Sequence, residues 1–166
     1  MFNYKYFFII IFSLLLANPI HAQSKGHWEE LPPMPSKRTE VAVTLLNEKI
    51  YVAGGFTQKG ITDRVDVWDS VIGNWAQLPS LPTPLHHTTI SAVNEKLYVI
   101  GGFASVMWTP VDTVYEYNPK TRNWTEKSRM PTKRGALAAS VIGKKIYVVG
   151  GANKKIFKLV NTPALE

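Results

Sequence analysis

The 166-residue chain contains no cysteine. A disulfide, a thiolate nucleophile, a cysteine metal ligand and a lipid anchor on an N-terminal cysteine are therefore all excluded. Long helical periodicity is also missing, and so are the sequence signatures of a nucleophile elbow, a phosphate loop and a zinc site. These absences predict a protein with no cofactor, no metal and no assigned catalytic residue.

An apolar run of the length that a membrane helix needs is also missing. The longest run, Phe7–Ala17, has about half of the roughly 20 residues required. It follows Lys5, ends at Asn18-Pro19 and precedes a small residue, Ala22, as in a signal peptide. We predict a signal peptide at 1–22 and an exported protein, periplasmic or secreted, with no stable membrane span after cleavage. An uncleaved membrane anchor is the alternative.

The chain carries a formal net charge of +7, but its cations are scattered. They gather only as pairs, such as Lys37-Arg38 and Lys154-Lys155. Nucleic-acid binding would need a basic stripe with aromatic side chains on one face. We therefore expect no nucleic-acid partner and interpret the cations as solvated strand ends and turns.

What the chain does have is 11 glycines, 11 prolines and many aromatic residues, a composition typical of a turn-rich β protein. Three markers also repeat in one register, with spacings of 47 and 49 residues. They are a tryptophan, a Met/Leu-Pro pair and a double glycine: Trp28, Trp75 and Trp124; Met34-Pro35, Leu81-Pro82 and Met130-Pro131; Gly54-Gly55, Gly101-Gly102 and Gly150-Gly151. The region 23–166 is therefore a repeat array, with units of about 28–74, 75–123 and a truncated 124–166.

Each unit is expected to form four short strands. In the first unit they are 41–46, 50–53, 65–69 and a fourth beginning at Trp75, with a two-residue turn at Asn47-Glu48 after the first. Asn and Gly tolerate the positive φ that such a turn requires. The double glycine after the second strand predicts a close approach of neighbouring backbones. We expect 156–160 to form at best a shortened third strand.

Together, these motifs resemble the kelch repeat. The matching elements are Arg, an apolar strand, Ile-Tyr-Val-X-Gly-Gly, Tyr-X-Tyr-Asn-Pro and Trp, and they extend from Trp28 to Gly151. The resemblance implies an all-β fold of kelch-type β-propeller blades, each a four-stranded antiparallel sheet around a central channel. In family members, an N-terminal fourth strand often completes the last blade, and Trp28–Leu31 could do so here.

The array holds about three blades, whereas propellers have about 4–8. An open fan would expose apolar faces on its terminal blades. We therefore expect either an incomplete piece of a longer propeller or a ring closed by a homodimer.

Candidate binding residues precede the first strand of each blade. Arg38 and Arg134 occupy equivalent positions, and Leu85 takes that place in the middle blade. Such arginines tie blades together through backbone carbonyls, or they contact a ligand. The residues that follow them, including Glu40, His86 and His87, would lie at the mouth of the channel, where Glu40 and His87 could converge on one ligand. Neighbouring strand residues point to opposite faces, so His86 and His87 are not expected to share a metal.

These features favour an exported binding module for a protein segment or a glycan, with enzymatic activity uncertain and less favoured. Resemblance offers two enzymatic alternatives. Copper oxidases of the galactose oxidase type need a Tyr–Cys cross-link, which a chain without cysteine cannot form. Periplasmic sialic acid mutarotases are kelch propellers with a signal peptide, and an activity of that type stays open.

Overall fold

The structure is a computed structural model that describes residues 26–155, 158–161 and 165. It separates into two compact units, 1–31 and 32–166. In the first unit, residues 26–31 take no regular secondary structure, so the fourth strand expected at Trp28–Leu31 is not formed there. The predicted signal peptide at 1–22 lies outside the described residues.

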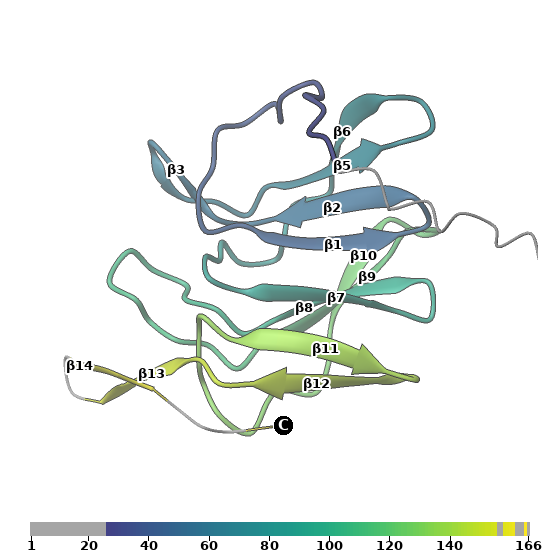
Figure 1. Ribbon diagram of the computed structural model, residues 1–166. Coiled ribbons are helices and arrows are strands. Elements are labelled where there is room, and N and C mark those ends of the chain that lie inside the picture. The colour runs from purple at the N-terminus through teal and green to yellow at the C-terminus, as the bar shows by residue number, and fades with distance from the viewer. Residues whose placement is uncertain (1–25, 156–157, 162–164, 166) are drawn as a thin grey trace, which may run out of the picture. The chain divides into compact units, whose positions relative to one another are not determined.

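The second unit is built from antiparallel β-sheets (Figure 1). The first sheet has the order β1-β2-β5-β6, formed by Ala42–Leu46, Lys49–Ala53, Val65–Asp69 and Asn74–Leu78. The second has the order β7-β8-β9-β10, formed by Thr89–Val93, Lys96–Ile100, Val114–Asn118 and Asn123–Glu126. The third repeat contributes the pair β11 (Ala138–Ile142) and β12 (Lys145–Val149). The four-stranded antiparallel blades predicted from the repeat are confirmed.

The inner strands of the three blades, β1, β7 and β11, lie side by side (Figure 1). The main core fills the space between the first two blades, and a smaller apolar cluster around Ile100 and Val148 joins the second blade to the third. The array therefore has its apolar core between sheets, and each blade depends on its neighbours for burial.

The predicted hairpin turns are present between the first and second strands. Asn47 and Glu48 have φ of 51° and 57°, and Asn94 and Glu95 have φ of 50° and 61°. Two successive positive φ angles are the signature of the type I′ turn, whose twist matches that of the flanking strands.

The double glycines bring neighbouring blades into contact, as predicted. Gly55 N donates to Leu85 O of the next blade at 2.8 Å, and Gly102 N donates to Arg134 O at 3.0 Å. A Cβ on Gly54 would collide with that same Leu85 carbonyl oxygen. The repeat tryptophans have a matching role, because the indole nitrogens of Trp75 and Trp124 donate to Pro32 O and Pro79 O, each at 2.9 Å.

One segment pairs differently from the prediction. The sequence predicts a shortened third strand at 156–160, beside β12. Instead β14 (Lys158–Asn161) pairs with β13 (Ala152–Lys155) in a local hairpin. The first blade has a shorter hairpin at the same place, β3 (Phe56–Thr57) with β4 (Gly60–Ile61). Pairing with the adjacent segment closes a much shorter loop than a return to β12 would.

Candidate functional site

The candidate site lies at the end of the blades where the chain enters the first strand of each blade. Glu40, His87 and Ala136 hold equivalent positions there, and all three have positive φ, at 55°, 49° and 54°. Backbone hydrogen bonds connect them, with His87 N donating to Glu40 O at 3.3 Å and Ala136 N donating to His87 O at 2.8 Å. The repeat thus places the same backbone position of three blades in one row.

This row brings the side chains of Glu40 and His87 together. His87 Nε2 lies 2.9 Å from Glu40 Oε2, and the carboxylate is about half exposed. The two side chains predicted to converge on one ligand therefore lie next to each other.

His86 and His87 do not point to opposite faces, and that expectation was wrong. Their Nδ1 atoms lie 2.8 Å apart, because His87 has a φ of 49° and the chain is not extended there. The rule of alternating faces applies only to extended strand residues.

The hydrogen bonds of this histidine pair fix the positions of their protons. His86 Nε2 lies 3.0 Å from Ser105 O, and because a carbonyl only accepts, Nε2 carries a proton. Neutral His86 then accepts at Nδ1 from His87 Nδ1–H, while His87 Nε2–H donates to Glu40. Burial lowers the pKa of His86, which favours its neutral form.

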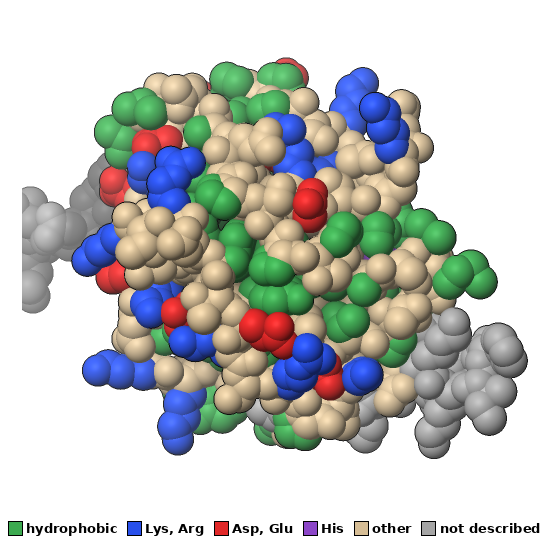
Figure 2. Space-filling view, turned by 180° about the vertical axis from the view of Figure 1, so that it is seen from behind, with side chains coloured by type: hydrophobic (Ala, Val, Ile, Leu, Met, Phe, Trp, Pro, Cys, Tyr) green, Lys and Arg blue, Asp and Glu red, His purple; other side chains and the backbone are tan. Residues whose placement is uncertain are grey.

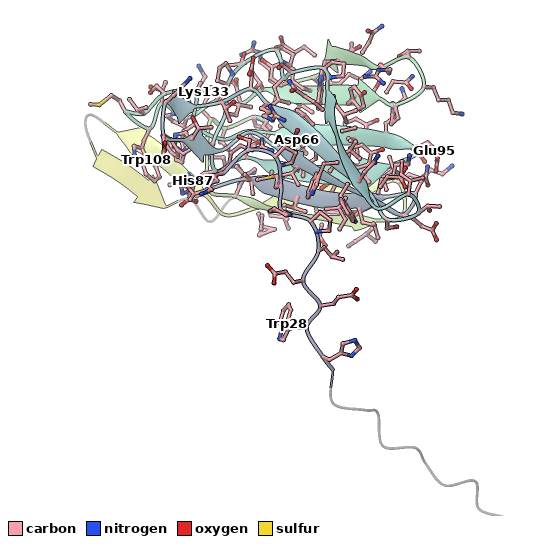
Figure 3. The ribbon with its side chains drawn as sticks, turned by 90° about the horizontal axis from the view of Figure 1, so that it is seen from above. Trp28, Asp66, His87, Glu95, Trp108 and Lys133 are labelled. Atoms are coloured by element: carbon pink, nitrogen blue, oxygen red, sulfur yellow. The ribbon has the colours of Figure 1, made fainter. Side chains whose placement is uncertain are left out.

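Aromatic rings surround the pair. The ring centroid of His86 is 4.2 Å from that of Phe56, and His87 is 4.7 Å from Trp108, which also contacts Phe103 at 5.1 Å. Trp108 is half-buried and has a φ of 58°, an uncommon backbone conformation for a large residue. Figure 3 shows His87 and Trp108 at the same end of the molecule. Together these residues form an aromatic cluster beside the half-exposed carboxylate of Glu40, which we call the aromatic–His site.

Three residues of this site, Phe56, Phe103 and Trp108, were not predicted from the sequence. A signal for Trp108 was present, because it is a tryptophan outside the repeat register and the second repeat is two residues longer than the first. Those two residues lie in its loop, where Phe103 bridges to Pro110, whereas in the first blade Phe56 pairs with Ile61. An insertion in one repeat maps to a loop on one face, which is often a binding face.

Arg38 and Arg134 are buried away from this site. Arg38 donates to Gly54 O at 3.0 Å and to Arg64 O at 2.8 Å, and Arg134 donates to Gly150 O at 2.8 Å. The expected bonding to backbone carbonyls is present, and the carbonyls named here belong to the same blade as the arginine that binds them. The equivalent residue of the middle blade, Leu85, is buried as well.

A hollow of about 440 Å³ lies between the first two blades at their hairpin end. Several polar side chains that line it are paired, with Lys49 Nζ 2.5 Å from Asp69 and Asn47 Nδ2 2.7 Å from Glu95. Arg122 also lines this hollow. The aromatic residues in the lining of this hollow are Tyr51 and Tyr117.

Within the described residues, no three His, Asp or Glu side chains are grouped so that they could hold a metal ion. In that part of the chain there is also no helix long and apolar enough to cross a membrane. On the face that Figure 2 shows, Lys and Arg side chains are scattered among acidic and polar ones.

Four-stranded antiparallel blades that pack through their inner strands define a β-propeller protein. Residues 16–151 match the family model of the KLHDC2/KLHL20/DRC7 Kelch-repeats domain. The chain therefore belongs to the kelch-repeat family.

Among solved structures, the chain is similar to the one titled "Structure of YjhT", with 26% sequence identity and a TM-score of 0.66. That match covers 76% of this chain and 38% of the other, so the chain spans well under half of its length. A comparison with curated proteins found no match.

Proposed function

We propose that the protein is an exported kelch-repeat binding module that recognises a glycan or a protein segment at the aromatic–His site. The observation that carries this proposal is the contact between the side chains of Glu40 and His87, at 2.9 Å, beside the half-buried indole of Trp108. Membership of the kelch family supports an interaction module. The class of ligand is inferred from the chemistry of the site, because the fold alone does not specify it.

The chemistry of the site favours a glycan over a peptide. The half-exposed Glu40 carboxylate accepts hydrogen bonds from hydroxyl groups, and the adjacent His87 anchors it. The half-buried indole of Trp108 offers an apolar surface of about the size of a sugar ring. A few polar groups beside such a surface fix the orientation of the ligand. A peptide with hydroxyl-bearing side chains would offer fewer hydroxyl groups to the Glu40 carboxylate than a glycan does.

A direct binding measurement tests this proposal. Calorimetry or tryptophan fluorescence with a panel of soluble glycans and peptides should reveal a ligand whose affinity falls at least about tenfold in Trp108→Ala and in Glu40→Gln. Glu48→Gln is the matched control, because Glu48 lies in a hairpin turn at the other end of the blades. A ligand that binds equally well to all three variants would contradict the assigned site.

A second candidate function is a sugar enzyme of the sialic acid mutarotase type. A carboxylate 2.9 Å from an imidazole is an arrangement that general acid–base catalysis uses. The test is the rate of anomer exchange of sialic acid, followed by NMR. Turnover that disappears in His87→Gln would favour the enzyme over the binding module.

Export is a separate part of the proposal and has its own test. N-terminal sequencing of protein recovered from the periplasm or medium should begin near Gln23. A full-length species that fractionates with the cytosol would contradict export while leaving the binding site unaffected.

A further inference from the structure

The hollow between the first two blades is lined by two tyrosines whose hydroxyl groups lack a protein partner. Tyr51 on β2 is 5% exposed and Tyr117 on β9 is 1% exposed, and both belong to the lining. Within the part of the chain that the structure describes, neither hydroxyl forms a hydrogen bond, and neither is sealed in the core. A buried polar group is ordinarily satisfied by the protein, by water or by a ligand. These two hydroxyls are therefore available to a ligand.

The two phenol groups come from different blades and lie near each other. Burial raises the pKa of Tyr117, the charge of Arg122 lowers it, and Tyr51 raises it again. Burial also raises the pKa of Tyr51. Both tyrosines therefore keep their protons at neutral pH and act as hydrogen-bond donors. An acceptor in the hollow would meet two hydroxyl donors with a guanidinium group close by.

The second blade shows what satisfies a tyrosine at this repeat position. Tyr98 is the equivalent of Tyr51, and its hydroxyl donates to Glu116 Oε2 at 2.7 Å. Two lysines bind the same carboxylate, with Lys96 Nζ 2.7 Å from Oε1 and Lys127 Nζ 3.4 Å from Oε2. The hydrogen bond from Lys96 is the largest cause that lowers the pKa of Glu116, so this carboxylate is charged. The tyrosine of the second blade thus has a carboxylate as its partner.

The first blade has a valine where the second blade has this glutamate. Val67 lies opposite Tyr51 in the sheet, as Glu116 lies opposite Tyr98. Because a valine side chain cannot accept a hydrogen bond, the first blade does not supply the carboxylate. Val67 and Leu78 instead give the hollow an apolar wall. The hollow therefore holds the donor of the second blade without the acceptor.

The charges around the hollow also favour an anion. Its lining holds three cations and two carboxylates, which are Lys49, Lys120, Arg122, Asp69 and Glu95. Lys49 Nζ lies 2.5 Å from Asp69, and Glu95 accepts from an asparagine at 2.7 Å. Lys120 and Arg122, on the exposed turn between β9 and β10, have no side-chain partner among the described residues. Their uncompensated charges attract a negatively charged group.

We propose that this hollow binds a small organic carboxylate that has an apolar body. The carboxylate accepts hydrogen bonds from the hydroxyls of Tyr51 and Tyr117 and a charge-assisted bond from Arg122. The apolar body lies against Val67 and Leu78. The volume of about 440 Å³ falls within the roughly 300–1,000 Å³ of small-molecule sites.

This site is separate from the aromatic–His site and does not depend on the function proposed for that site. Figure 3 shows Glu95, one of the lining residues of the hollow, at the opposite end of the molecule from His87 and Trp108. Both walls of the hollow belong to the two four-stranded blades. All the groups that the proposal uses are therefore in place within the described residues.

Ligand-observed NMR with benzoate as the probe tests the proposal. We expect saturable binding with a dissociation constant of about 1 mM or lower. Benzamide has nearly the same shape without the charge, and acetate has the charge without the apolar ring. Each should bind at least about tenfold more weakly than benzoate. Absence of saturable benzoate binding, or an equal affinity for either of the other two probes, would overturn the proposal.

Tyr51→Phe tests whether the probe binds in this hollow, because it removes one hydroxyl and keeps the ring. It should weaken benzoate binding at least about tenfold and leave the midpoint of urea unfolding unchanged. Tyr98→Phe is the matched control, since its hydroxyl donates to Glu116. That variant should unfold at a lower urea concentration and bind benzoate like the wild type. Wild-type benzoate affinity in Tyr51→Phe would contradict the assigned site.

Arg122→Gln tests the cation in the same way. It should weaken benzoate binding by more than it weakens benzamide binding, because only benzoate carries the charge. Arg129→Gln removes the same charge at the other end of β10 and should keep the wild-type affinity. Trp108→Ala, which alters only the aromatic–His site, should also keep it, so the two sites can fail separately. Equal losses of benzoate affinity in Arg122→Gln and Arg129→Gln would contradict a specific site in the hollow.

Discussion

At the scale of single residues, buried charges hold the entry of the first blade together. Arg38 and Asp66 have fully buried side chains, and Arg38 Nη2 lies 2.5 Å from Asp66 Oδ2. Arg64 adds a second contact, with Nε 2.8 Å from the same oxygen. Burial lowers the pKa of Arg38, and the charge of Asp66 opposes this effect. The carboxylate therefore compensates two guanidinium groups, one of which has no access to water.

Asp66→Ala should destabilise the protein strongly. The substitution leaves the Arg38 guanidinium buried without a counter-charge, and breaking one side of a buried pair costs about 3–5 kcal/mol. Urea unfolding followed by tryptophan fluorescence would measure the loss. Glu126→Ala, which removes an exposed partner of Arg129, is the control and should change stability little. Similar midpoints for the two variants would contradict the role of the buried pair.

His86 should make the protein less stable as the pH falls below about 6.5. Burial lowers its pKa below the ordinary value of 6.5; the charge of His87 acts in the same direction, while Ser105 and Glu40 act against it. The unfolded chain then takes up a proton near pH 6.5 that the folded protein does not. The stabilising contribution is complete above that pH and is lost as the pH falls toward the folded pKa.

NMR titration of the imidazole protons would give the pKa of His86 directly, and unfolding at pH 7 and pH 5 would give its consequence. His86→Phe should lack this component of the pH dependence. A His86 pKa at or above 6.5 would contradict the prediction.

At the scale of secondary structure, the strands were predictable from the sequence and the loops were not. The third strand of the first unit has the predicted bounds, 65–69, because the repeat register specifies it, and its equivalent in the second unit is Val114–Asn118. The contact between His86 and His87 was not predictable, since it depends on a positive φ at a residue that is not glycine. The two extra residues of the Trp108 loop are visible in the sequence, but its packing against His87 depends on the tertiary structure.

Gly54→Ala tests how the elements pack across the blade boundary. Gly54 and Gly73 share a φ near 65°, so alanine strains the backbone equally at both, by about 1–2 kcal/mol. At Gly54, the new Cβ would also collide with the Leu85 carbonyl, whereas no atom of the described residues lies near it at Gly73. Gly54→Ala should therefore be less stable than Gly73→Ala by a further 1–3 kcal/mol or so in chemical denaturation. Equal stabilities would show that the blades can separate there without cost.

At the scale of the whole molecule, the packing of blades against one another supplies the core. Fully burying a Val, Leu or Ile side chain contributes roughly 1.5–3 kcal/mol, and the core between the first two blades holds several, among them Val65, Leu97 and Val99. A small domain is stable by only about 5–15 kcal/mol in total. The packing between blades is therefore comparable in free energy to the whole stability of the protein.

Leu97→Ala should show how much the packing between blades contributes. Leu97 is fully buried in the core between the first two blades, and replacing a buried leucine by alanine costs about 2–5 kcal/mol. Val71→Ala, at a turn residue that is 74% exposed, is the control and should change the free energy of unfolding by at most about 0.5 kcal/mol. Chemical denaturation followed by tryptophan fluorescence would measure both variants. Equal free energies of unfolding would contradict the role of the interface between blades.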